Sequence, residues 1–497
     1  MSESDSIKEK GQDVVLKKKK SLADEFLEFI SPYHVSTNPY ELESASADLA
    51  SLPIYHYKFK KKYRATHVIR PADTNELSLA IKICREKLIP VTIRSAGTSC
   101  FSSATPSRGG VIIDVRRLNK IFEIDSEKMT VKCGSGISWL NLIEQLADFG
   151  LAPKCYPTSF KTSCVAGFIG TPGDAGIGVF KHGAMKSTIL SLEVVLPNGE
   201  IINVSKESRG DFSIDDFMGT YGIYGAISTV ELSLTTLKTS LEIIGYGFTL
   251  IKDAFNFYEA LKTDIPNKPF FLSISEGKFE KYSHIDYPKQ NWLVWAVLYD
   301  QPTETSKGIS TIKNLASKFN SIEVENAYLR EKWRDISDAE VSIGLSARNL
   351  IFQEYWITDD KLLDFIETYS VITKKFKFPT ALYTLTGEAG MSRIKIFGLT
   401  DIDHTLEFFA VKAFLHNLAV KAFKQGDRLY TIGIVNTFYY LKFLPDVVAK
   451  MSILKKKIDP KHLFNSYRIT KATMKYWRIA LLFKTAQILY KILKIRK

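Results

Sequence analysis

The feature of the sequence that most constrains the fold is a glycine-dense stretch at Val165–Gly178, which reads VAGFIGTPGDAGIG. A regular helix or strand does not tolerate glycine at this density, because each glycine inside such an element costs roughly 0.5–1 kcal/mol relative to alanine. Val165, Phe168 and Ile169 are interleaved with the glycines, and a mobile loop rarely carries such residues. The stretch therefore predicts a packed loop with a flat or charged ligand against its backbone.

Two further loops share this character, at 94–103 (RSAGTSCFSS) and at 217–229 (FMGTYGIYGAIST). The first directly follows an expected strand at 89–93. Small residues let a backbone approach a diphosphate closely, and consecutive N–H groups together with the Thr98 and Ser99 hydroxyls can donate hydrogen bonds to its oxygens. A serine-rich surface turn would look similar to the first loop alone, but three such loops together favour a nucleotide site. No GxGxxG follows a strand, which disfavours NAD as the primary cofactor.

The length of 497 residues exceeds what one hydrophobic core usually supports, so we expect two or three lobes. Short apolar runs and helical spacing at 65–93 predict a βαβ opening, and the Pro197-Asn198-Gly199 turn predicts a hairpin over 191–204. Beyond about residue 238 the chain becomes richer in aromatic residues and loses its glycine clusters. These patterns predict an α+β fold with a second lobe after 238.

The formal net charge of +13 predicts attraction to phosphate-bearing partners, to an anionic membrane surface or to an anionic substrate. The lysines are concentrated at the two termini instead of forming a stripe with stacking aromatics, so nucleic acid is not expected as a partner. The five cysteines show no CxxC spacing, which disfavours a disulfide framework and an iron–sulfur cluster. The polar segment Met1–Lys20 lacks the pattern of a secretory signal, and we expect a cytoplasmic protein with a solvated arm.

The tail at 471–497 combines eight Lys or Arg with many apolar residues and no acidic residue. Its uncharged runs are far shorter than the roughly 20 residues that cross a bilayer. A basic helix with Trp and Leu is suited to an anionic membrane surface, so we expect peripheral contact with the cytoplasmic face of a membrane. Docking on the protein or on a partner is the alternative, because Lys484 and Lys491 interrupt the apolar face.

Seven segments, read in chain order, resemble the FAD-binding signature set of the vanillyl-alcohol oxidase / p-cresol methylhydroxylase (PCMH-type) family, and within it the group of D-lactate dehydrogenases and glycolate oxidases. They are 94–99, 109–121, 131–151, 157–178, 190–202, 217–228 and 458–465. The resemblance implies FAD between two α+β subdomains, and a substrate-binding cap. It places an N-terminal extension at 1–61, the FAD-binding domain at 62–238, the cap at 239–446, a C-terminal return to the FAD domain at 447–470 and the basic tail helix at 471–497.

The resemblance also implies which residues hold the flavin. Thr98 stands where relatives carry an attaching histidine, so the FAD is expected to be bound noncovalently. The implied cofactor-binding residues are Arg94, Ser95, Ala96, Gly97, Thr98, Ser99, Pro157, Thr158, Ser159, Ala166, Gly167, Thr171, Gly173, Gly178, Gly225, Ile227 and Asn465.

The second lobe departs from the group's pattern. A flavin accepts a hydride at its N5, so the protein must place a substrate C–H against that atom and remove a proton. The group's histidine motifs GHxGDGNxH and GEHG are replaced here by 385–392 (LTGEAGMS) and 430–437 (YTIGIVNT), and no metal site is expected. Candidates for the vacated role, each of which could equally be a strand or core residue, are Glu388, Tyr383, Tyr430, Tyr439 and Tyr440, with Arg334 or Arg393 for an anionic group.

His182 is expected beside the flavin, either packing and hydrogen bonding there or transferring a proton. The leading hypothesis is an FAD-dependent oxidoreductase that takes a hydride from a small hydroxyl-bearing substrate, such as a 2-hydroxy acid or a polyol, and passes electrons to a quinone or a partner protein. The alternative is a flavin-bearing electron-transfer or assembly subunit without substrate chemistry of its own, motivated by the missing histidines.

Overall fold

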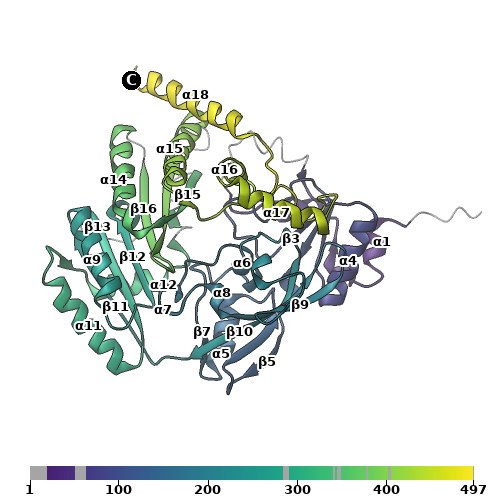
Figure 1. Ribbon diagram of the computed structural model, residues 1–497, viewed down its shortest axis with the longest axis horizontal. Coiled ribbons are helices and arrows are strands. Elements are labelled where there is room, and N and C mark those ends of the chain that lie inside the picture. Colours follow the sequence, from purple (N-terminus) through teal and green to yellow (C-terminus); the bar gives the residue numbers. More distant parts are fainter. Residues whose placement is uncertain are drawn as a thin grey trace, which may run out of the picture.

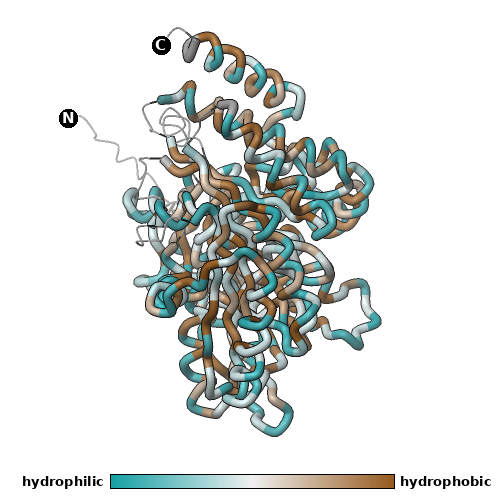
Figure 2. Tube along the Cα trace, turned by 90° about the vertical axis from the view of Figure 1, so that its left-hand side faces the viewer, coloured by the Kyte–Doolittle hydropathy of each residue, from teal (hydrophilic) through white to brown (hydrophobic). Residues whose placement is uncertain are grey.

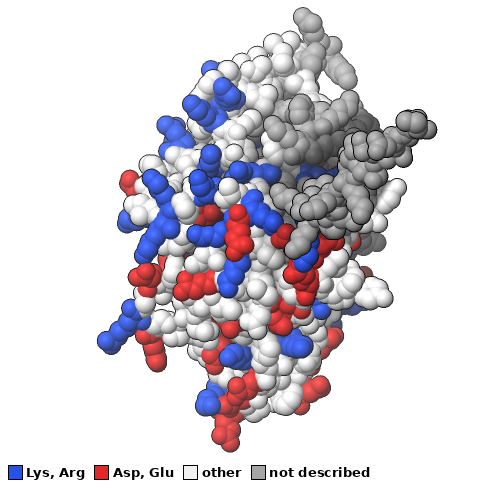
Figure 3. Space-filling view, turned by 90° about the vertical axis from the view of Figure 1, so that its right-hand side faces the viewer, with Lys and Arg blue, Asp and Glu red and all other residues white. Residues whose placement is uncertain are grey.

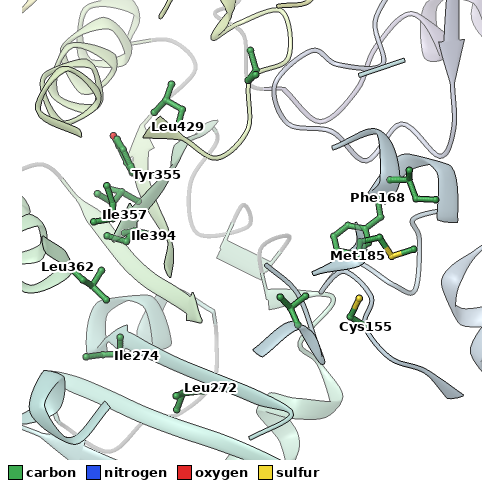
Figure 4. Close-up of a cluster of buried hydrophobic side chains, with 14 of the residues drawn as sticks. Cys155, Phe168, Met185, Leu272, Ile274, Tyr355, Ile357, Leu362, Ile394 and Leu429 are labelled. Atoms are coloured by element: carbon green, nitrogen blue, oxygen red, sulfur yellow. The ribbon is translucent and has the colours of Figure 1, made fainter. Parts of the chain in front are cut away.

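The structure is a computed structural model that describes residues 20–50, 63–283, 290–339, 342–343, 349–376, 379–400 and 404–495. Figure 1 shows two lobes side by side, the first with two sheets and the second with one large sheet. The largest apolar cluster includes residues of both lobes. Figure 4 shows part of it, with Phe168 and Met185 from the first lobe and Leu272, Tyr355 and Ile394 from the second. The predicted α+β class is confirmed.

The first sheet of the first lobe has four strands in the order β1-β2-β4-β3, at Val35–Ser36, His67–Ile69, Val111–Asp114 and Val91–Arg94. β2, β4 and β3 run parallel. Helix α4 (Thr74–Glu86) connects β2 to β3 and is capped by the preceding Asp73, whose carboxylate accepts hydrogen bonds from two backbone N–H groups of the first turn. The predicted βαβ unit is present, with β4 inserted between its two strands.

The second sheet carries the predicted hairpin. Its path is β5-β6-β10-β8-β9, at Ile121–Asp125, Thr130–Gly134, Ala226–Thr236, Ile189–Val195 and Ile201–Ser205, and β7 (Leu151–Pro153) also pairs with β10. The turn between β8 and β9 places Gly199 at φ +82°, a conformation that favours glycine. Helix α5 (Trp139–Ala147) covers this sheet and buries Trp139 and Leu142 completely.

The N-terminal residues take a larger part in the first lobe than an extension at 1–61 implies. Helix α1 (Leu22–Phe26), the 3-10 turn η1 (Pro32–His34) and helix α2 (Pro39–Ala45) surround β1, which pairs antiparallel with β2. Phe26 and Ile30 are buried in the core under α4. Apolar burial therefore places residues 22–45 in the first lobe, while the expected arm at 1–19 lies outside the described residues.

The second lobe is built on an eight-stranded antiparallel sheet. Its order is β14-β11-β13-β12-β16-β17-β15-β18, at Ile322–Glu323, Ser240–Phe248, Trp292–Asp300, Phe271–Glu276, Thr380–Thr386, Met391–Thr400, Asn349–Thr358 and Arg428–Leu429. Figure 1 shows its outer helices α9, α11, α14 and α15, at Ile251–Thr263, Pro302–Ala316, Asp359–Phe376 and Thr405–Lys424. Strand β10 ends at Thr236 and β11 begins at Ser240 in a different sheet, so we propose the domain boundary at 238 between them.

The C-terminal segment crosses back to the first lobe. Helices α16 (Thr437–Phe443) and α17 (Pro445–Ile458) are followed by a stretch that lies beside β3, where the Val91 N–H donates to Leu463 O and the Asn465 N–H donates to Val91 O, both at 2.9 Å. The last helix, α18 (Tyr476–Ile495), then packs along α15 at the upper edge of the molecule (Figure 1).

Replacement of Lys455 by Met tests how firmly this return is held. Lys455 Nζ is buried, forms an ion pair of 2.7 Å with Asp459 and donates to the carbonyl oxygens of Ile223 and Phe464. The replacement leaves a buried carboxylate without its cation, so we expect the free energy of unfolding to fall by about 3–5 kcal/mol. Urea unfolding measures this loss. The exposed neighbour Lys456 provides the control, because K456M is expected to change the free energy by less than about 0.5 kcal/mol; equal midpoints for the two variants would contradict the expectation.

Candidate active site

A cavity of about 250 Å³ lies where the three glycine-rich loops of the first lobe face the sheet of the second. Most of the residues expected to hold FAD are gathered on its wall, although sequence reasoning could not say which of them share one surface. The expected residues that line the cavity are Ser95, Ala96, Gly97, Thr98, Ser99, Pro157, Thr158, Ser159, Ala166, Gly167, Thr171, Gly225, Ile227 and Asn465.

The first loop presents free hydrogen-bond donors to this cavity. It begins where β3 ends at Arg94, and Gly97 adopts φ +74°. The backbone N–H groups of Gly97, Thr98 and Ser99 donate to no other residue in the described part of the chain. The buried Oγ of Ser103, also on the wall, has no hydrogen-bond partner among the described residues. Such a row of donors fits an anionic diphosphate, as FAD has.

Arg94 supports this loop from behind, which corrects its expected role as a cofactor contact. Its guanidinium donates to Ala47 O at 2.8 Å and to Ala104 O at 3.3 Å, and it is not among the residues that line the cavity. Two residues after Ala47, the Leu49 N–H donates to Ser99 O of the loop at 2.9 Å. Residues 47–49 and Arg94 therefore fix the shape of the loop.

The second loop forms a short helix, so the expectation that Val165–Gly178 holds no regular helix is wrong for its first turn. Helix α6 (Val165–Gly170) follows Cys164. At Gly167, an added Cβ atom would meet Ser95 Oγ at 3.5 Å, an ordinary van der Waals distance, so the first two loops lie next to each other here. Gly173 and Gly178 have positive φ and pack against Met185 and the Lys154 carbonyl, respectively. They were expected to hold the cofactor, but they do not line the cavity and instead shape the loop.

Asn465 joins three segments at the cavity wall. Its Oδ1 accepts a hydrogen bond from the Ile93 N–H at 2.9 Å, and its Nδ2 donates to Tyr221 O at 2.9 Å and to Gly222 O at 3.0 Å. The end of β3, the third loop and the C-terminal return therefore meet at one buried side chain.

The sheet of the second lobe contributes a charged wall that sequence reasoning largely missed. Glu354 on β15 lies opposite Lys395 on β17, and their side chains form an ion pair of 2.8 Å. Arg393, two residues before Lys395 and so on the same face of β17, approaches Glu354 Oε1 at 3.6 Å. All three side chains are at most 10% exposed and line the cavity. The signal that could have found them is the presence of charged residues inside two apolar strands, Glu354 in FQEYW and Arg393 and Lys395 in SRIKIF.

Tyr430 also lines the cavity, next to Arg393. The guanidinium of Arg393 lies 5.3 Å from the centre of the Tyr430 ring. The Tyr430 hydroxyl accepts from the Ala175 N–H at 3.1 Å and donates to Ala175 O at 3.3 Å. Burial raises the pKa of Tyr430 far above its usual value of 10, so the hydroxyl stays protonated and acts as a hydrogen-bonding group.

Three other candidates lie away from the cavity, which corrects the expectations for them. Arg334 is 69% exposed and pairs with Asp335 at the surface. Glu388, in the turn between β16 and β17, accepts a hydrogen bond from the Ala184 N–H at 3.1 Å and so joins the two lobes. The His182 ring packs near Phe270, and burial together with Lys181 lowers its pKa to about 4, which favours a neutral packing role.

The other expected tyrosines also lie off the wall. Tyr383 contacts Arg393 through a 3.3 Å hydrogen bond, while Tyr439 and Tyr440 are buried beyond the loop that carries Tyr430. Within the described residues, no group of three His, Cys, Asp or Glu side chains is placed to hold a metal ion.

The cavity wall offers poor nucleophiles for covalent attachment of a flavin. No histidine lines it in the described part of the chain, and Thr98 occupies the first loop. Of the two cysteines on the wall, Cys100 donates to Thr98 O at 3.8 Å, and burial raises the pKa of the Cys164 thiol. Thiolate is the reactive form of cysteine, so these surroundings fit noncovalent binding.

Comparison with known proteins identifies the first lobe. A family model described as an FAD binding domain matches residues 65–205. Glycolate oxidase subunit GlcD of Bacillus subtilis is 25% identical over 435 aligned positions, and the match covers 83% of this chain and 91% of that protein. D-lactate dehydrogenase of Archaeoglobus fulgidus is 22% identical over 416 residues, with 81% of this chain and 91% of that protein covered.

Solved structures show the same fold over both lobes. p-Cresol methylhydroxylase with bound substrate superposes with a TM-score of 0.76 at 14% identity, covering 90% of this chain and 96% of that one. Alkyldihydroxyacetonephosphate synthase superposes with a TM-score of 0.70 at 17% identity, covering 91% and 86%. The chain therefore has an FAD-binding domain at 65–205, its cofactor is FAD, and it shares the fold of p-cresol methylhydroxylase over both lobes. Among its relatives in sequence are the glycolate oxidase subunit and the D-lactate dehydrogenase.

Replacement of Asn465 by Asp tests the junction at the cofactor site. The change turns an N–H donor into a carboxylate oxygen that faces two carbonyl oxygens, so we expect the dissociation constant of FAD to rise at least about tenfold. Titration of the apoprotein with FAD, followed by flavin fluorescence, measures the constant. Asn203 is exposed on β9, so N203D should bind FAD as the parent does, and an unchanged constant for N465D would contradict the assigned role.

Replacement of His182 by Gln tests its packing role through pH. Because the folded-state pKa is about 4 and the ordinary value is 6.5, the unfolded chain takes up a proton that the folded chain refuses as pH falls through this range. We therefore expect stability to fall from about pH 6.5 towards about pH 4, and H182Q to lose less stability over that range. Turnover should stay within about twofold of the parent, whereas a proton-transfer role requires a loss of about 100-fold or more. The exposed His404 gives a control, H404Q.

Proposed function

We propose that this protein is an FAD-dependent oxidoreductase acting on the CH–OH group of a small substrate, with a 2-hydroxy acid as the favoured class. The observation that carries the proposal is the buried charged wall of the cap, which faces the FAD loops across one cavity. The supporting relatives are named for glycolate and D-lactate, both of which are 2-hydroxy acids.

The charge of this wall suits an anionic substrate. Arg393 and Lys395 supply two positive charges and Glu354 one negative charge, so the three leave one positive charge at a buried surface. An arginine next to a lysine can hold a carboxylate by charge-assisted hydrogen bonds. A substrate carboxylate placed here would bring the neighbouring carbon towards the flavin loops.

A residue of the same wall can also remove the proton of the substrate hydroxyl. FAD supplies the hydride acceptor. Glu354 is the one carboxylate among the described residues that line the cavity, and it also accepts a hydrogen bond from Thr431 Oγ1. We assign Glu354 as the acceptor of the hydroxyl proton, so that the C–H electron pair leaves as hydride, the O–H proton moves to the carboxylate and a carbonyl forms. Tyr430, held protonated by burial, would orient the substrate.

The electron acceptor is proposed to be a quinone or a partner protein, with the protein in the cytoplasm. Within the described residues no helix is long and apolar enough to span a bilayer. The tail expected at the membrane surface forms α18, and its outer surface is considered below.

A second candidate is a flavin-bearing subunit that serves electron transfer or assembly without substrate chemistry of its own. The observation that favours it is a cavity wall without histidine in the described part of the chain. The Bacillus subtilis relative is itself named as a subunit.

Anaerobic mixing of the FAD-loaded protein with 2-hydroxy acids, polyols and aldoses separates the two candidates. Bleaching of the flavin absorbance by one of them is the expected result, and bleaching by none favours the subunit without chemistry. For the substrate found, R393Q should raise KM at least about tenfold through loss of a charge-assisted contact, and E354Q should lower kcat about 100-fold or more. The surface variant R334Q should leave both constants unchanged; a loss in R334Q equal to that in R393Q would contradict the assigned wall.

A further inference from the structure

The positive charge of the protein is concentrated in its last segment. Residues 441–497 contain fifteen Lys or Arg and two Asp, so this segment alone has a formal charge of +13, which equals that of the whole chain. The preceding 440 residues are therefore neutral in sum. Figure 3 shows one side of the molecule, where most Lys and Arg side chains gather on the upper part and most Asp and Glu side chains on the lower part. Charge of one sign gathered on one surface indicates a partner of the opposite sign.

Helix α18 is already docked on the protein by its inner side. Ile479 and Ala486 are buried, and the Tyr476 and Phe483 rings lie 5.8 and 5.3 Å from the His416 ring of α15. Tyr476 also lies against Phe443 of α16, with the ring centres 5.5 Å apart. This packing fixes the helix to the second lobe, so its outer side is held towards solvent.

The outer side of α18 is a regular apolar stripe. Trp477, Leu481, Ile488 and Ile492 are spaced so that they share one face of the helix, opposite Ile479 and Ala486, and they are 57, 58, 49 and 45% exposed. Arg478, Lys484 and Lys491 are exposed beside this stripe. Figure 2 shows the helix at the upper edge of the molecule, with hydrophobic and hydrophilic residues alternating along it.

Helix α17, which precedes α18 in the chain, also exposes apolar and basic side chains. It exposes Val447 and Ile453, the latter at 73%, together with Lys450 and Lys456. We use the term basic face for the exposed residues of α18. An apolar stripe with a tryptophan and flanking basic side chains suits the boundary between lipid headgroups and acyl chains.

We propose that the basic face docks on an anionic lipid surface, with the apolar stripe of α18 entering the headgroup region and the lysines facing the lipid phosphates. Lysine and arginine near such a surface each add to the affinity. Two other occupants fit less well. Nucleic acid offers phosphates but no apolar layer for Leu481 and Ile488, and a second copy of the chain would bring a face of the same charge against this one. The inference goes beyond the proposed oxidoreductase activity and does not depend on it.

Co-sedimentation of the FAD-loaded, full-length protein with vesicles tests the proposal. We expect at least about tenfold stronger partition onto vesicles of phosphatidylcholine with phosphatidylglycerol than onto phosphatidylcholine alone, and weaker partition at high salt. The variants L481S/I488S and R478E/K484E should each lower the partition at least about tenfold. All four residues are exposed, so flavin absorbance and thermal unfolding should match the parent.

Matched controls separate the basic face from general surface effects. Leu250 and Ile322, which are 60% and 58% exposed in the second lobe, give the control L250S/I322S, and the exposed Lys281 and Lys318 give K281E/K318E. Both should bind vesicles as the parent does. Equal partition onto the two vesicle types, or equal losses in test and control variants, would overturn the proposal. So would tight binding to duplex DNA without vesicle binding, or a dimer by light scattering that L481S/I488S converts to a monomer without vesicle binding.

Discussion

The contact between the end of β3 and the C-terminal return is the constraint on which the flavin site depends. Asn465 accepts from the Ile93 N–H and donates to the carbonyl oxygens of Tyr221 and Gly222, so one side chain fixes the first loop, the third loop and the return. Arg468, fully buried, adds bonds to Ser103 O and Thr105 O in the same region. The free amides of residues 97–99 can point into the cavity because these contacts hold the loop from the other side.

The cap wall follows from a different physical rule. In an antiparallel pair, residues directly opposite each other project on the same side of the sheet, and alternate residues of one strand share that side. Glu354 and Lys395 meet by the first relation, and Arg393 joins Lys395 by the second. Burial of three charges is tolerated here because each has a partner of opposite sign within the group. The wall is thus a stable part of the sheet, and its net positive charge suits the anion that we propose to bind there.

The sequence predicted the first lobe better than the second for physical reasons. The loops at 94–99, 157–171 and 225–227 carry glycines and hydroxyls whose local spacing already indicates a ligand-binding site, and the structure brings them to one cavity. The partners of β15 and β17 depend on register across the sheet, which local spacing does not contain, so Glu354 and Lys395 were missed. Arg334 and His182 were expected at the site, but the Arg334 side chain is 69% exposed to solvent and the His182 ring packs beside Phe270. Residues 22–45 resemble an extension in the sequence, because the contacts that bury Phe26 and Ile30 are made with α4 and are not visible in the segment itself.

The hydrogen bond between Ile93 and Asn465 joins residues that are 372 positions apart. Contacts of this sequence separation form late in folding, because a long loop must be closed before they contribute. During synthesis the first lobe and the cap would therefore fold around an incomplete cofactor site, and the loop at 94–99 would acquire its final shape only when nearly the whole chain had been made. Incorporation of FAD then becomes one of the last steps of maturation, and a chain interrupted before residue 465 would retain much of its fold while remaining unable to hold the flavin.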